Sequence, residues 1–421
     1  MLYDLNLLRE YILILNTKKF RIVIIGANFA GLTAASKLSR CYDVTVVDPK
    51  LDFQWTPNIH EILSDVKKET NLNLNLATII TRLGHHFINQ TVTRIDGDIH
   101  TVTLDDKQTL NYDALLITSG HARSNYGIKG ASEYAYGFRT ANDVIQIYND
   151  IETALNSNKR TINISIIGGG FTGVEVLGEL LRKYSTNERL HISVVDRASR
   201  LVSTLPKKLS DDILGQCKNY QLSFYFEKEI TEVRKSNVHF SDNESIKSDI
   251  TIWSAGTKLP NYLETIDTQK SSSGLAVNDY LQSKKFSNIF VAGDSASLPK
   301  SLPKQASIAL DMGQHAAMNI TRFCAEKSLK PFKADTIPVL LSLGDINTYF
   351  IQGKLVLASP MLAAGKEAVY QFYMAKLSRL LPLEQSALGL ASRITLSTEK
   401  LLLAEMLKLR PKILFQRSKI L

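Results

Sequence analysis

The sequence predicts an α/β protein in which one strand–turn–helix–strand unit occurs twice. Residues 21–25, RIVII, are a short β-branched run of the kind that forms a buried parallel strand. A glycine-containing turn, a helix-compatible segment and a second strand, YDVTVVD, follow in that order. The same order begins again at residue 163, in NISIIGGGFTGVEVLGELLRKY and LHISVVDRASR. Two such units predict two parallel sheets, each covered by helices.

Length and composition are those of a globular protein with several domains. The chain has 421 residues, 44% of them hydrophobic, enough to bury a large core and to divide into two or three domains. Charged residues make up 22% and aromatic residues 8%, which excludes a disordered or low-complexity chain. Lys and Arg exceed Asp and Glu by 50 to 41, and this net charge of +9 matters only where it is concentrated.

The cysteines and the apolar runs give information about the cellular compartment and about membrane insertion. Cys41, Cys217 and Cys324 are far apart, so we expect neither a zinc site nor a local redox disulfide, and a reducing intracellular compartment fits. No apolar run reaches the ~18–20 residues of a membrane-spanning helix. Residues 1–19 carry charges within their apolar stretch, unlike a signal peptide, and predict either a short amphipathic helix or a frayed tail.

The two turns contain the glycines of a Rossmann-like dinucleotide-binding loop. In G-x-G-x-x-G the first glycine permits a tight turn, the second lets the backbone approach a pyrophosphate, and the third brings helix and strand together. An acid at the end of the next strand accepts hydrogen bonds from ribose hydroxyls. We expect two bound dinucleotides; the alternative is two tight turns without a ligand. The positions are Gly26, Asn28, Gly31 and Asp48 in the first unit, and Gly168, Gly170, Gly173 and Asp196 in the second.

Asn28 replaces the glycine that would let a pyrophosphate come close. A side chain at this position takes up room. Asn is the best non-glycine residue there, because it tolerates positive φ and its amide can donate to a phosphate. The following helix also offers free N–H groups and the positive end of its dipole. We therefore expect the first turn to be adapted to a ligand rather than inactive.

A third segment, residues 287–297 (SNIFVAGDSAS), predicts a strand that runs into Gly293 and Asp294 and then toward a helix. A carboxylate at such a place can accept hydrogen bonds from a sugar-alcohol chain such as ribityl. The alternative is that Asp294 caps the helix.

The order of these motifs resembles that of the two-dinucleotide-binding-domain flavoproteins, the pyridine nucleotide-disulfide oxidoreductase superfamily. That superfamily includes disulfide reductases, type II NADH:quinone oxidoreductases, sulfide:quinone oxidoreductases and apoptosis-inducing-factor-like proteins. The resemblance spans residues 20–375 and implies FAD on the first turn, NAD(P)H on the second, and an FAD domain split around the NAD domain. The motifs are the first glycine turn, LLITSG (115–120), the second glycine turn with GVE, IWSAG (252–256) and VAGD (291–294).

The resemblance also implies domain limits and cofactor contacts. The FAD domain would comprise residues 20–135 and 260–330 and the NAD(P)H domain residues 136–259. Residues 331–421 would form a C-terminal α+β or helical region, with residues 1–19 as an extension. Asp48 would hold the FAD ribose, Asp294 the ribityl or phosphate, and Val92 would flank the adenine. Beyond the residues of the two turns, the implied cofactor-binding set is Thr56, Val92, Gly120, Gly256, Gly293, Asp294 and Ala306.

Two branches of the superfamily fit and two do not. The segment LDFQWTPNIHEILSDV contains no CxxxxC, which excludes the dithiol relay of a disulfide reductase, and Cys217 and Cys324 give little support for sulfide oxidation. FQWTPNIHEILS is similar to the F-x-x-T-P stretch of type II NADH dehydrogenases, which would place Thr56 near the flavin ring. Ser307 and Asp311 stand where that branch carries two glutamines, and residues 337–362 look more like the apoptosis-inducing-factor-like quinone reductases. Both branches imply an NAD(P)H-oxidising flavoenzyme, commonly with a quinone acceptor.

Three further residue assignments follow from this resemblance and from charge. Glu175 is the candidate catalytic carboxylate, in the first turn of its helix, where it would position the nicotinamide or relay protons; the alternative is an acid that interacts with the helix dipole. Asp196 favours NADH over NADPH, because it would repel a 2′-phosphate, although Arg197 and Arg200 follow closely. Adjacent His85 and His86 lie in a loop-like stretch and have no spaced partner acids, so we expect no metal site.

The C-terminal end is basic and apolar. Residues 369–383 and 388–410 predict two helices, and beyond residue 406 Lys and Arg alternate with Leu, Ile and Phe415 without an acid. Such an end could bind an anionic bilayer, which would suit an enzyme whose quinone is dissolved in lipid. The alternative is packing on the core or on a homodimer partner. No nucleic-acid recognition motif accompanies the basic residues.

Two functions are compatible with these features. The first is an FAD-dependent NADH dehydrogenase that passes electrons to a quinone or another two-electron acceptor. It would be cytoplasmic and peripheral on the inner face of the cell membrane, or mitochondrial in a eukaryote. The second is an NAD(P)H-responsive redox or interaction flavoprotein of the apoptosis-inducing-factor kind with slow turnover, which the substitutions at 307 and 311 keep open.

Overall fold

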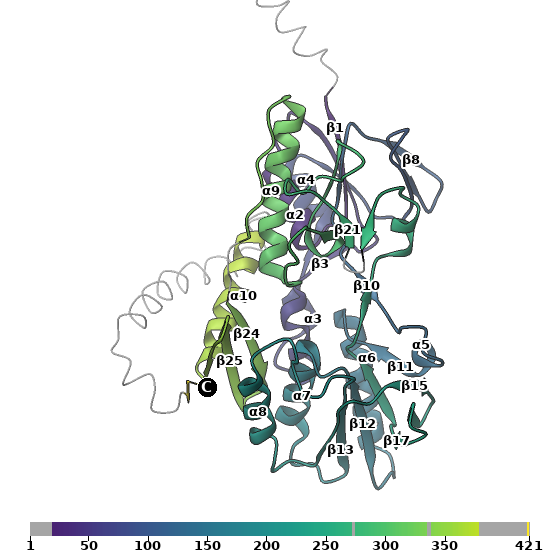
Figure 1. Cartoon of the computed structure of the whole chain (residues 1–421), viewed down its shortest axis with the longest axis vertical. Coiled ribbons are helices and arrows are strands. Elements are labelled where there is room, and N and C mark those ends of the chain that lie inside the picture. Colours follow the sequence, from purple (N-terminus) through teal and green to yellow (C-terminus); the bar gives the residue numbers. More distant parts are fainter. Residues whose placement is uncertain (1–18, 272–273, 335–337, 379–418, 421) are drawn as a thin grey trace, which may run out of the picture. The chain divides into compact units, whose positions relative to one another are not determined.

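A computed structural model describes residues 19–271, 274–334, 338–378 and 419–420 (Figure 1). These residues fall into two compact units, each discontinuous in sequence. Within the described ranges, no helix combines the length and apolarity needed to cross a membrane. The predicted N-terminal helix and the predicted helix 388–410 lie outside the described residues. Unit 1 contains the described parts of Met1–Asp52, Asn75–His121 and Leu259–Ala334, and unit 2 those of Phe53–Leu74, Ala122–Lys258 and Asp335–Leu421.

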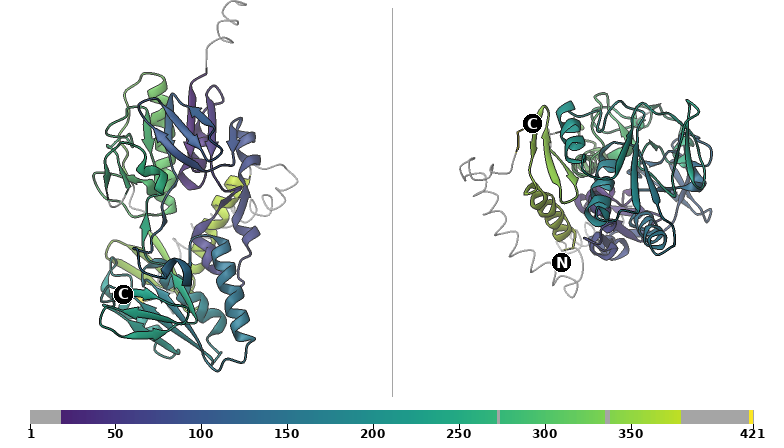
Figure 2. Two further views of the ribbon diagram at one scale, coloured as in Figure 1. Left: turned by 90° about the vertical axis from the view of Figure 1, so that its right-hand side faces the viewer. Right: turned by 90° about the horizontal axis from the view of Figure 1, so that it is seen from below.

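Unit 1 is built on a parallel five-stranded sheet in the order β22–β9–β1–β2–β5. β1 (Arg21–Ile25) lies at its centre, and its apolar residues are buried as the β-branched run predicts. α2 (Phe29–Lys37) and α9 (Ala306–Cys324) pack along each other, as both views show (Figures 1 and 2). Gly313 permits this contact, because a Cβ there would lie 2.2 Å from the Ala30 carbonyl oxygen. The other strands are β2 (Asp43–Val47), β5 (His86–Ile88), β9 (Ala114–Ile117) and β22 (Ile289–Val291).

Two small sheets complete unit 1 beside the helix α4 (Leu76–Leu83). One is an antiparallel three-stranded sheet of consecutive strands, β6 to β8, and the other has the order β20–β21–β23. Their strands are β6 (Val92–Asp96), β7 (Thr101–Leu104), β8 (Thr109–Asn111), β20 (Lys270–Ser271), β21 (Gly274–Ala276) and β23 (Ala296–Ser297); the 3₁₀ helices η2 (Asn261–Glu264) and η3 (Gly293–Ser295) stand in the connections.

Unit 2 repeats the same construction. Its parallel sheet has the order β11–β18–β12–β13–β14. In each unit the strand before the glycine turn is central, the strand after the helix pairs on one side, and a later strand pairs on the other. The change of direction beside the central strand is the place where open parallel sheets bind ligands. The strands are β11 (Ala135–Gly137), β12 (Ile162–Ile167), β13 (Leu190–Val195), β14 (Leu222–Tyr225) and β18 (Ile250–Trp253); the helices are α5 (Ala131–Tyr134), α6 (Ala141–Leu155), α7 (Phe171–Tyr184) and α8 (Lys207–Gln216).

A C-terminal antiparallel sheet, β24–β25–β26–β27, packs against α7 and carries α10 (Figure 2). Gly178 of α7 permits the approach, because a Cβ there would lie 2.3 Å from the Gly344 nitrogen. The sheet consists of β24 (Val339–Leu343), β25 (Asn347–Gln352), β26 (Leu355–Ala358) and β27 (Lys419–Ile420), and α10 spans Leu362–Ser378. This confirms a third, α+β part after the two parallel sheets.

The remaining elements are short helices and the strands of small two- or three-stranded sheets. Residues 53–74 of unit 2 contain the 3₁₀ helix η1 (Thr56–Ile62) and α3 (Glu69–Leu72). The remaining strands are β3 (Asp52–Gln54), β4 (Asn73–Asn75), β10 (Ala122–Arg123), β15 (Ile230–Val233), β16 (Asn237–Phe240), β17 (Ser245–Lys247) and β19 (Thr257–Lys258).

Three local predictions were wrong. His86 was expected in a loop but opens β5, whereas His85 does lie in the short connection before that strand, buried with Nε2 3.0 Å from the Ala35 carbonyl oxygen. The helix expected soon after Asp294 begins only at Ala306, with Gln305 at its N-cap, so Asp294 does not cap it. The helix predicted from residue 369 begins earlier, at Leu362.

Candidate nucleotide-binding sites

The first glycine turn is tightly closed around the end of β1. Gly26 has φ +94°, a left-handed conformation that favours glycine. A Cβ on Gly31 would lie 1.8 Å from the Gly26 carbonyl oxygen, so only glycine allows α2 to start this close to the strand. Thr118 Oγ1 donates to the carbonyl oxygens of Ile25 and Gly26, at 2.9 and 2.7 Å. The turn therefore has the geometry that its sequence predicts.

Asp48 at the end of β2 braces this turn. Its Oδ2 accepts the Ala27 N–H at 2.7 Å and its Oδ1 accepts the Lys50 N–H at 2.8 Å. Burial raises the pKa of Asp48, and the two backbone hydrogen bonds oppose that shift. A carboxylate oxygen can accept a second hydrogen bond, so Asp48 can brace the turn and still bind a ribose hydroxyl.

Asn28 occupies the N-cap of α2 with φ −88°, so its tolerance of positive φ, one of the two reasons given for asparagine here, is not used. Its Oδ1 atom is buried and has no hydrogen-bond partner among the described residues. Buried polar atoms are rarely left unpaired, and the two ends of an amide group are interchangeable by a 180° rotation. After that rotation the amide NH2 group would take the unpaired position and could donate to an anion at the helix N-terminus, which fits a pyrophosphate on the first turn.

The second turn has the same parts in the same places. Gly168 has φ +106°, and a Cβ on Gly173 would lie 1.8 Å from the Gly168 carbonyl oxygen. Ser254 Oγ donates to the carbonyl oxygens of Ile167 and Gly168 at 2.9 and 3.0 Å, as Thr118 does in unit 1. Gly170 at the N-cap of α7 is exposed, and a Cβ added to it would meet open space, with nothing within 4 Å.

Asp196 braces the second turn as Asp48 braces the first. Its Oδ2 accepts the Gly169 N–H at 2.5 Å, and its Oδ1 accepts the Ala198 N–H at 2.7 Å. Arg200, which the sequence left as a possible phosphate contact, instead donates to backbone carbonyl groups of its own loop.

The remaining predicted cofactor residues divide between the units. In unit 1, Gly120 lies beside Asp294, because Ser295 Oγ donates to the Gly120 carbonyl oxygen at 3.1 Å. Val92 is buried in β6, and Gly293 packs against the start of α2. Thr56 opens η1 in unit 2, and Gly256 lies there against the Tyr126 ring.

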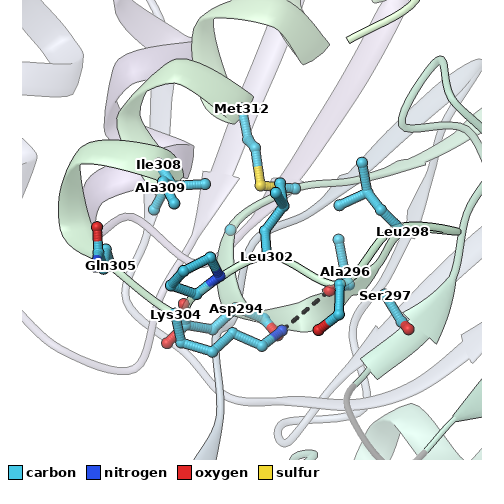
Figure 3. A pocket seen from close by; sticks show the side chains of 13 residues that line it. Asp294, Ala296, Ser297, Leu298, Leu302, Lys304, Gln305, Ile308, Ala309 and Met312 are labelled. Carbon is cyan, nitrogen blue, oxygen red and sulfur yellow. Dashed lines mark hydrogen bonds between the residues drawn. The ribbon is translucent and has the colours of Figure 1, made fainter. Parts of the chain in front are cut away.

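A pocket of about 360 Å³, partly open to solvent, lies beside Asp294 and the start of α9 (Figure 3). Lys304 extends along it and donates to the carbonyl oxygens of Asp294 and Ala296 at 2.6 and 3.0 Å. Burial lowers the pKa of Lys304, and the Asp294 charge opposes this. Ile308 and Met312 of α9 form its apolar side. Of the predicted cofactor residues, Asp294 lines this pocket and Ala306 begins α9 beside it; Lys304 was missed, because no motif distinguishes it from a surface lysine.

Glu175 belongs to a compact charged cluster in unit 2. It is the fifth residue of α7, so its predicted place in the first helical turn, and the helix-dipole alternative, were wrong. Lys366 Nζ of α10 donates to Glu175 Oε1 at 2.6 Å and to His60 Nε2 at 3.1 Å. His60 Nδ1 is 3.7 Å from Glu175 Oε2. Burial raises the pKa of Glu175, and the nearby Lys366 ammonium opposes this shift. Burial also lowers the pKa of His60 well below its usual range. His60 is therefore neutral beside a Glu–Lys pair.

A second acid, Glu179, lies one turn further along α7 and is completely buried. It accepts hydrogen bonds from Ser64 and Arg182, and Arg182 also pairs with Asp345 at 2.8 Å. Burial raises the pKa of Glu179 to about 7 although both partners oppose the shift. Sequence reasoning missed Glu179 and Lys366 and gave His60 no role in a site, because their meeting depends on contacts between distant segments.

The structure contains no cluster of three or more His, Cys, Asp or Glu side chains suited to a metal ion within the residues it describes. The three cysteines are separate: Cys41 is exposed, Cys217 is buried and Cys324 is half-buried.

Comparison with known proteins agrees with this geometry. Demethylphylloquinone reductase NdbB of Synechocystis sp. is 24% identical over 84% of this chain and 91% of its own. A type II NADH:quinone oxidoreductase of Haemophilus influenzae is 26% identical over 83% and 91% of the two chains. These proteins match this chain over nearly their full length.

Solved structures share the fold. NDH2 from Plasmodium falciparum in complex with NADH superposes with a TM-score of 0.77 at 16% identity, covering 90% of this chain and 98% of its own. The sulfide:quinone oxidoreductase of Aquifex aeolicus superposes with a TM-score of 0.74 at 16% identity, covering 96% and 97%. The sequence profile described as pyridine nucleotide-disulphide oxidoreductase matches residues 20–313. Both glycine turns have the same geometry, and in each the acid after the next strand accepts an N–H group of the turn. The chain belongs to the pyridine nucleotide-disulphide oxidoreductase family.

Proposed function

We propose that this protein is an FAD-dependent oxidoreductase that takes a hydride from NADH and passes electrons to a quinone. The observation that carries the proposal is the pair of matched glycine turns, each braced by an acid at the end of the next strand. Two such turns in one chain suit two adenine dinucleotides. The relatives named for NADH:quinone and demethylphylloquinone reduction supply the acceptor class.

In this proposal unit 1 holds FAD. The Asn28 amide, whose buried Oδ1 has no partner among the described residues, and the α2 N-terminus would bind the pyrophosphate, and Asp48 the ribose. Asp294 and Gly120, which lie close together, would contact the ribityl and ring side. Bound flavin supplies the hydride-accepting and electron-donating chemistry; these residues bind and orient it.

Unit 2 would hold NADH. The exposed Gly170 at the α7 N-terminus leaves room for the pyrophosphate, and Asp196 would accept from an adenosine 2′-hydroxyl. The Arg200 guanidinium is already bonded to four carbonyl oxygens, so it offers little to a 2′-phosphate. NADH is accordingly the preferred donor, and NADPH the weaker one.

Glu175 and Lys366 would supply the proton that the reaction needs. NADH, one proton and a quinone give NAD⁺ and a quinol, so one proton enters from solution. A buried carboxyl group with a raised pKa, in contact with an ammonium group, is suited to carry it. Neutral His60 would hold the Lys366 ammonium in place through Nε2.

Replacing Glu175 tests this assignment. Glu175→Gln should slow quinone reduction about 100-fold, as loss of a general acid–base group does, while flavin content stays the same. Glu367→Gln on α10 is the matched control, because Glu367 pairs with Lys67 and does not contact Glu175. Equal rates of quinone reduction in the Glu175 variant and the wild type would refute the assignment.

We also propose that the basic C-terminal end binds the inner face of the cell membrane, or a mitochondrial membrane in a eukaryote. The supporting features are the Lys and Arg residues beyond 406 and the lipid solubility of quinones. Flotation with anionic liposomes tests it: the full chain should float and a chain lacking residues 386–421 should not. A truncated chain that floats equally well would instead favour packing on the core or on a homodimer partner.

Anaerobic mixing tests the function as a whole. The purified protein should lose its flavin absorbance rapidly with NADH and recover it rapidly with a soluble quinone. A flavin absorbance that is lost rapidly with NADH and does not return when quinone is added would contradict the proposal. That outcome would favour an apoptosis-inducing-factor-like protein that senses NAD(P)H and turns over slowly.

A further inference from the structure

The loop after β13 in unit 2 is held from within by one arginine. Arg200 Nη1 donates to the carbonyl oxygens of Leu201 and Val202, both at 3.3 Å. Its Nη2 donates to those of Ser203 and Leu205, at 2.6 and 2.8 Å. One planar guanidinium thus fixes the carbonyl groups of most of residues 201–205.

Val202 in this loop has an unfavourable backbone. Its φ is +42°, which is uncommon for any residue except glycine and is a clear outlier for a β-branched one. Val202 and Leu201 are buried, so packing holds them there. The Val202 N–H donates to the Gly169 carbonyl oxygen at 2.7 Å. In this strained conformation the Val202 backbone makes a hydrogen bond to the glycine turn.

That hydrogen bond sets the direction of the next N–H group. The Gly169 carbonyl and the Gly170 N–H belong to one planar trans peptide, so they point in opposite directions. With the carbonyl held by Val202, the Gly170 N–H points away from the loop. Gly170 is exposed, and the space beside its Cα is open. This N–H group at the start of α7 is among those that would meet a pyrophosphate.

Among the described residues, the first glycine turn has no counterpart to the Val202–Gly169 hydrogen bond. Asp48 fixes the Ala27 N–H as Asp196 fixes the Gly169 N–H. Within the residues that the structure describes, no hydrogen bond reaches the Ala27 carbonyl oxygen. Asn28, with its own amide, stands there in place of glycine. The brace is thus particular to the turn assigned to the pyridine nucleotide.

We propose that Arg200 is a positioning residue for the pyridine dinucleotide: it holds the 201–205 loop so that Val202 fixes the Gly169–Gly170 peptide with its N–H toward the pyrophosphate. The inference rests on the proposed function, in which unit 2 binds NADH. It differs from a role in nucleotide selection. A phosphate-binding arginine would affect NADP⁺ alone, whereas a brace on the pyrophosphate turn affects both nucleotides equally.

The test measures binding of NAD⁺ and NADP⁺ to the flavin-loaded, full-length protein by calorimetry. The oxidised nucleotides avoid turnover. Arg200→Gln should weaken both by a similar factor, about tenfold, the scale of one lost hydrogen bond. KM for NADH should rise with kcat largely kept. Arg197→Gln is the matched control, because Arg197 is the exposed neighbour, and should bind NAD⁺ as the wild type does.

A second variant guards against loss of folding. Arg200→Lys keeps the charge but replaces the planar fork by a single ammonium group, and should give a smaller loss for both nucleotides. Wild-type NAD⁺ affinity in either variant with intact flavin content, or a loss confined to NADP⁺, would overturn the inference while leaving the proposed function intact. Failure of the wild type itself to bind NAD⁺ would overturn both.

Discussion

Asp48 and Asp196 show what a single acid does at the residue scale. Each accepts the N–H group of the second residue of its glycine turn, at 2.7 and 2.5 Å, and each accepts a further backbone N–H two residues along its own loop. The acid that the sequence assigns to a ribose therefore also shapes the turn to which we assign the pyrophosphate. Replacing it has two effects, which a well-chosen variant can separate.

Asp196→Asn should reduce the preference for NADH over NADPH. The amide keeps one acceptor for the backbone but no longer repels a 2′-phosphate. We expect the ratio of kcat/KM for the two nucleotides to fall about tenfold, the size of one charge-assisted contact. An unchanged ratio would show that Asp196 does not face the adenosine ribose. Asp48→Asn serves as control, since it should alter flavin retention and leave the ratio unchanged.

Glu179 makes a pH-dependent contribution to stability. Its pKa of about 7 in the folded protein exceeds the ordinary value of 4.5 that applies to the unfolded chain. The folded state therefore holds the proton more tightly, and ionisation costs stability. The cost is absent below pH 4.5, grows between pH 4.5 and 7, and is complete above pH 7.

Glu179→Gln removes this cost. The groups that face the site are Ser64, Arg182, Glu61 and Lys366, and all of them remain. The free energy of unfolding of the variant minus that of the wild type should be about 2–3 kcal/mol larger at pH 8 than at pH 5. Urea denaturation at the two pH values measures it. A difference that does not change with pH would mean that Glu179 is ionised throughout.

At the scale of elements, α7 connects the nucleotide turn to the C-terminal sheet. Its first residues follow the glycine turn, Glu175 meets Lys366 of α10, and Gly178 meets the turn after β24. The interface depends on backbone contact at Gly178, where even a methyl group would displace Gly344.

Gly178→Ala should lower the free energy of unfolding by about 1–3 kcal/mol, because overpacking a close backbone contact forces the layers apart. Gly215→Ala in α8 is the matched control. Its added Cβ meets open space, and Ala favours a helix over Gly by about 1 kcal/mol, so this variant should be as stable as the wild type or more stable. Thermal unfolding compares the two. Equal melting temperatures for Gly178→Ala and the wild type would contradict the packing of β24 on α7.

The sequence predicted the elements whose signals are local. The strand, glycine turn, helix and terminal acid follow one another within about 30 residues, so a βαβ unit can be recognised without tertiary information. The pairing of Glu175 with Lys366 spans 191 residues and leaves no local pattern. For Asn28, the sequence suggested that tolerance of positive φ suits asparagine to the turn, but the residue has φ −88°, a value open to any residue.

At the scale of the whole molecule, the chain contains one construction twice, in two units that each collect distant segments. Both sheets have the same strand order around the central strand, and Thr118 and Ser254 close the two turns with the same pair of hydrogen bonds. The two turns differ at the third position. Unit 1 has the amide of Asn28, whereas unit 2 has Gly170, which follows a carbonyl group that accepts a hydrogen bond from Val202. We assign FAD to the first turn and NADH to the second.

The most direct test is to identify what the purified protein releases on denaturation. The visible spectrum should be that of a bound flavin, and chromatography of the extract should yield FAD in equimolar amount with the chain. Asn28→Ala should retain less FAD, because the amide that would bind the pyrophosphate is gone. A colourless protein that takes up no FAD on reconstitution would contradict the central claim that both turns hold a dinucleotide.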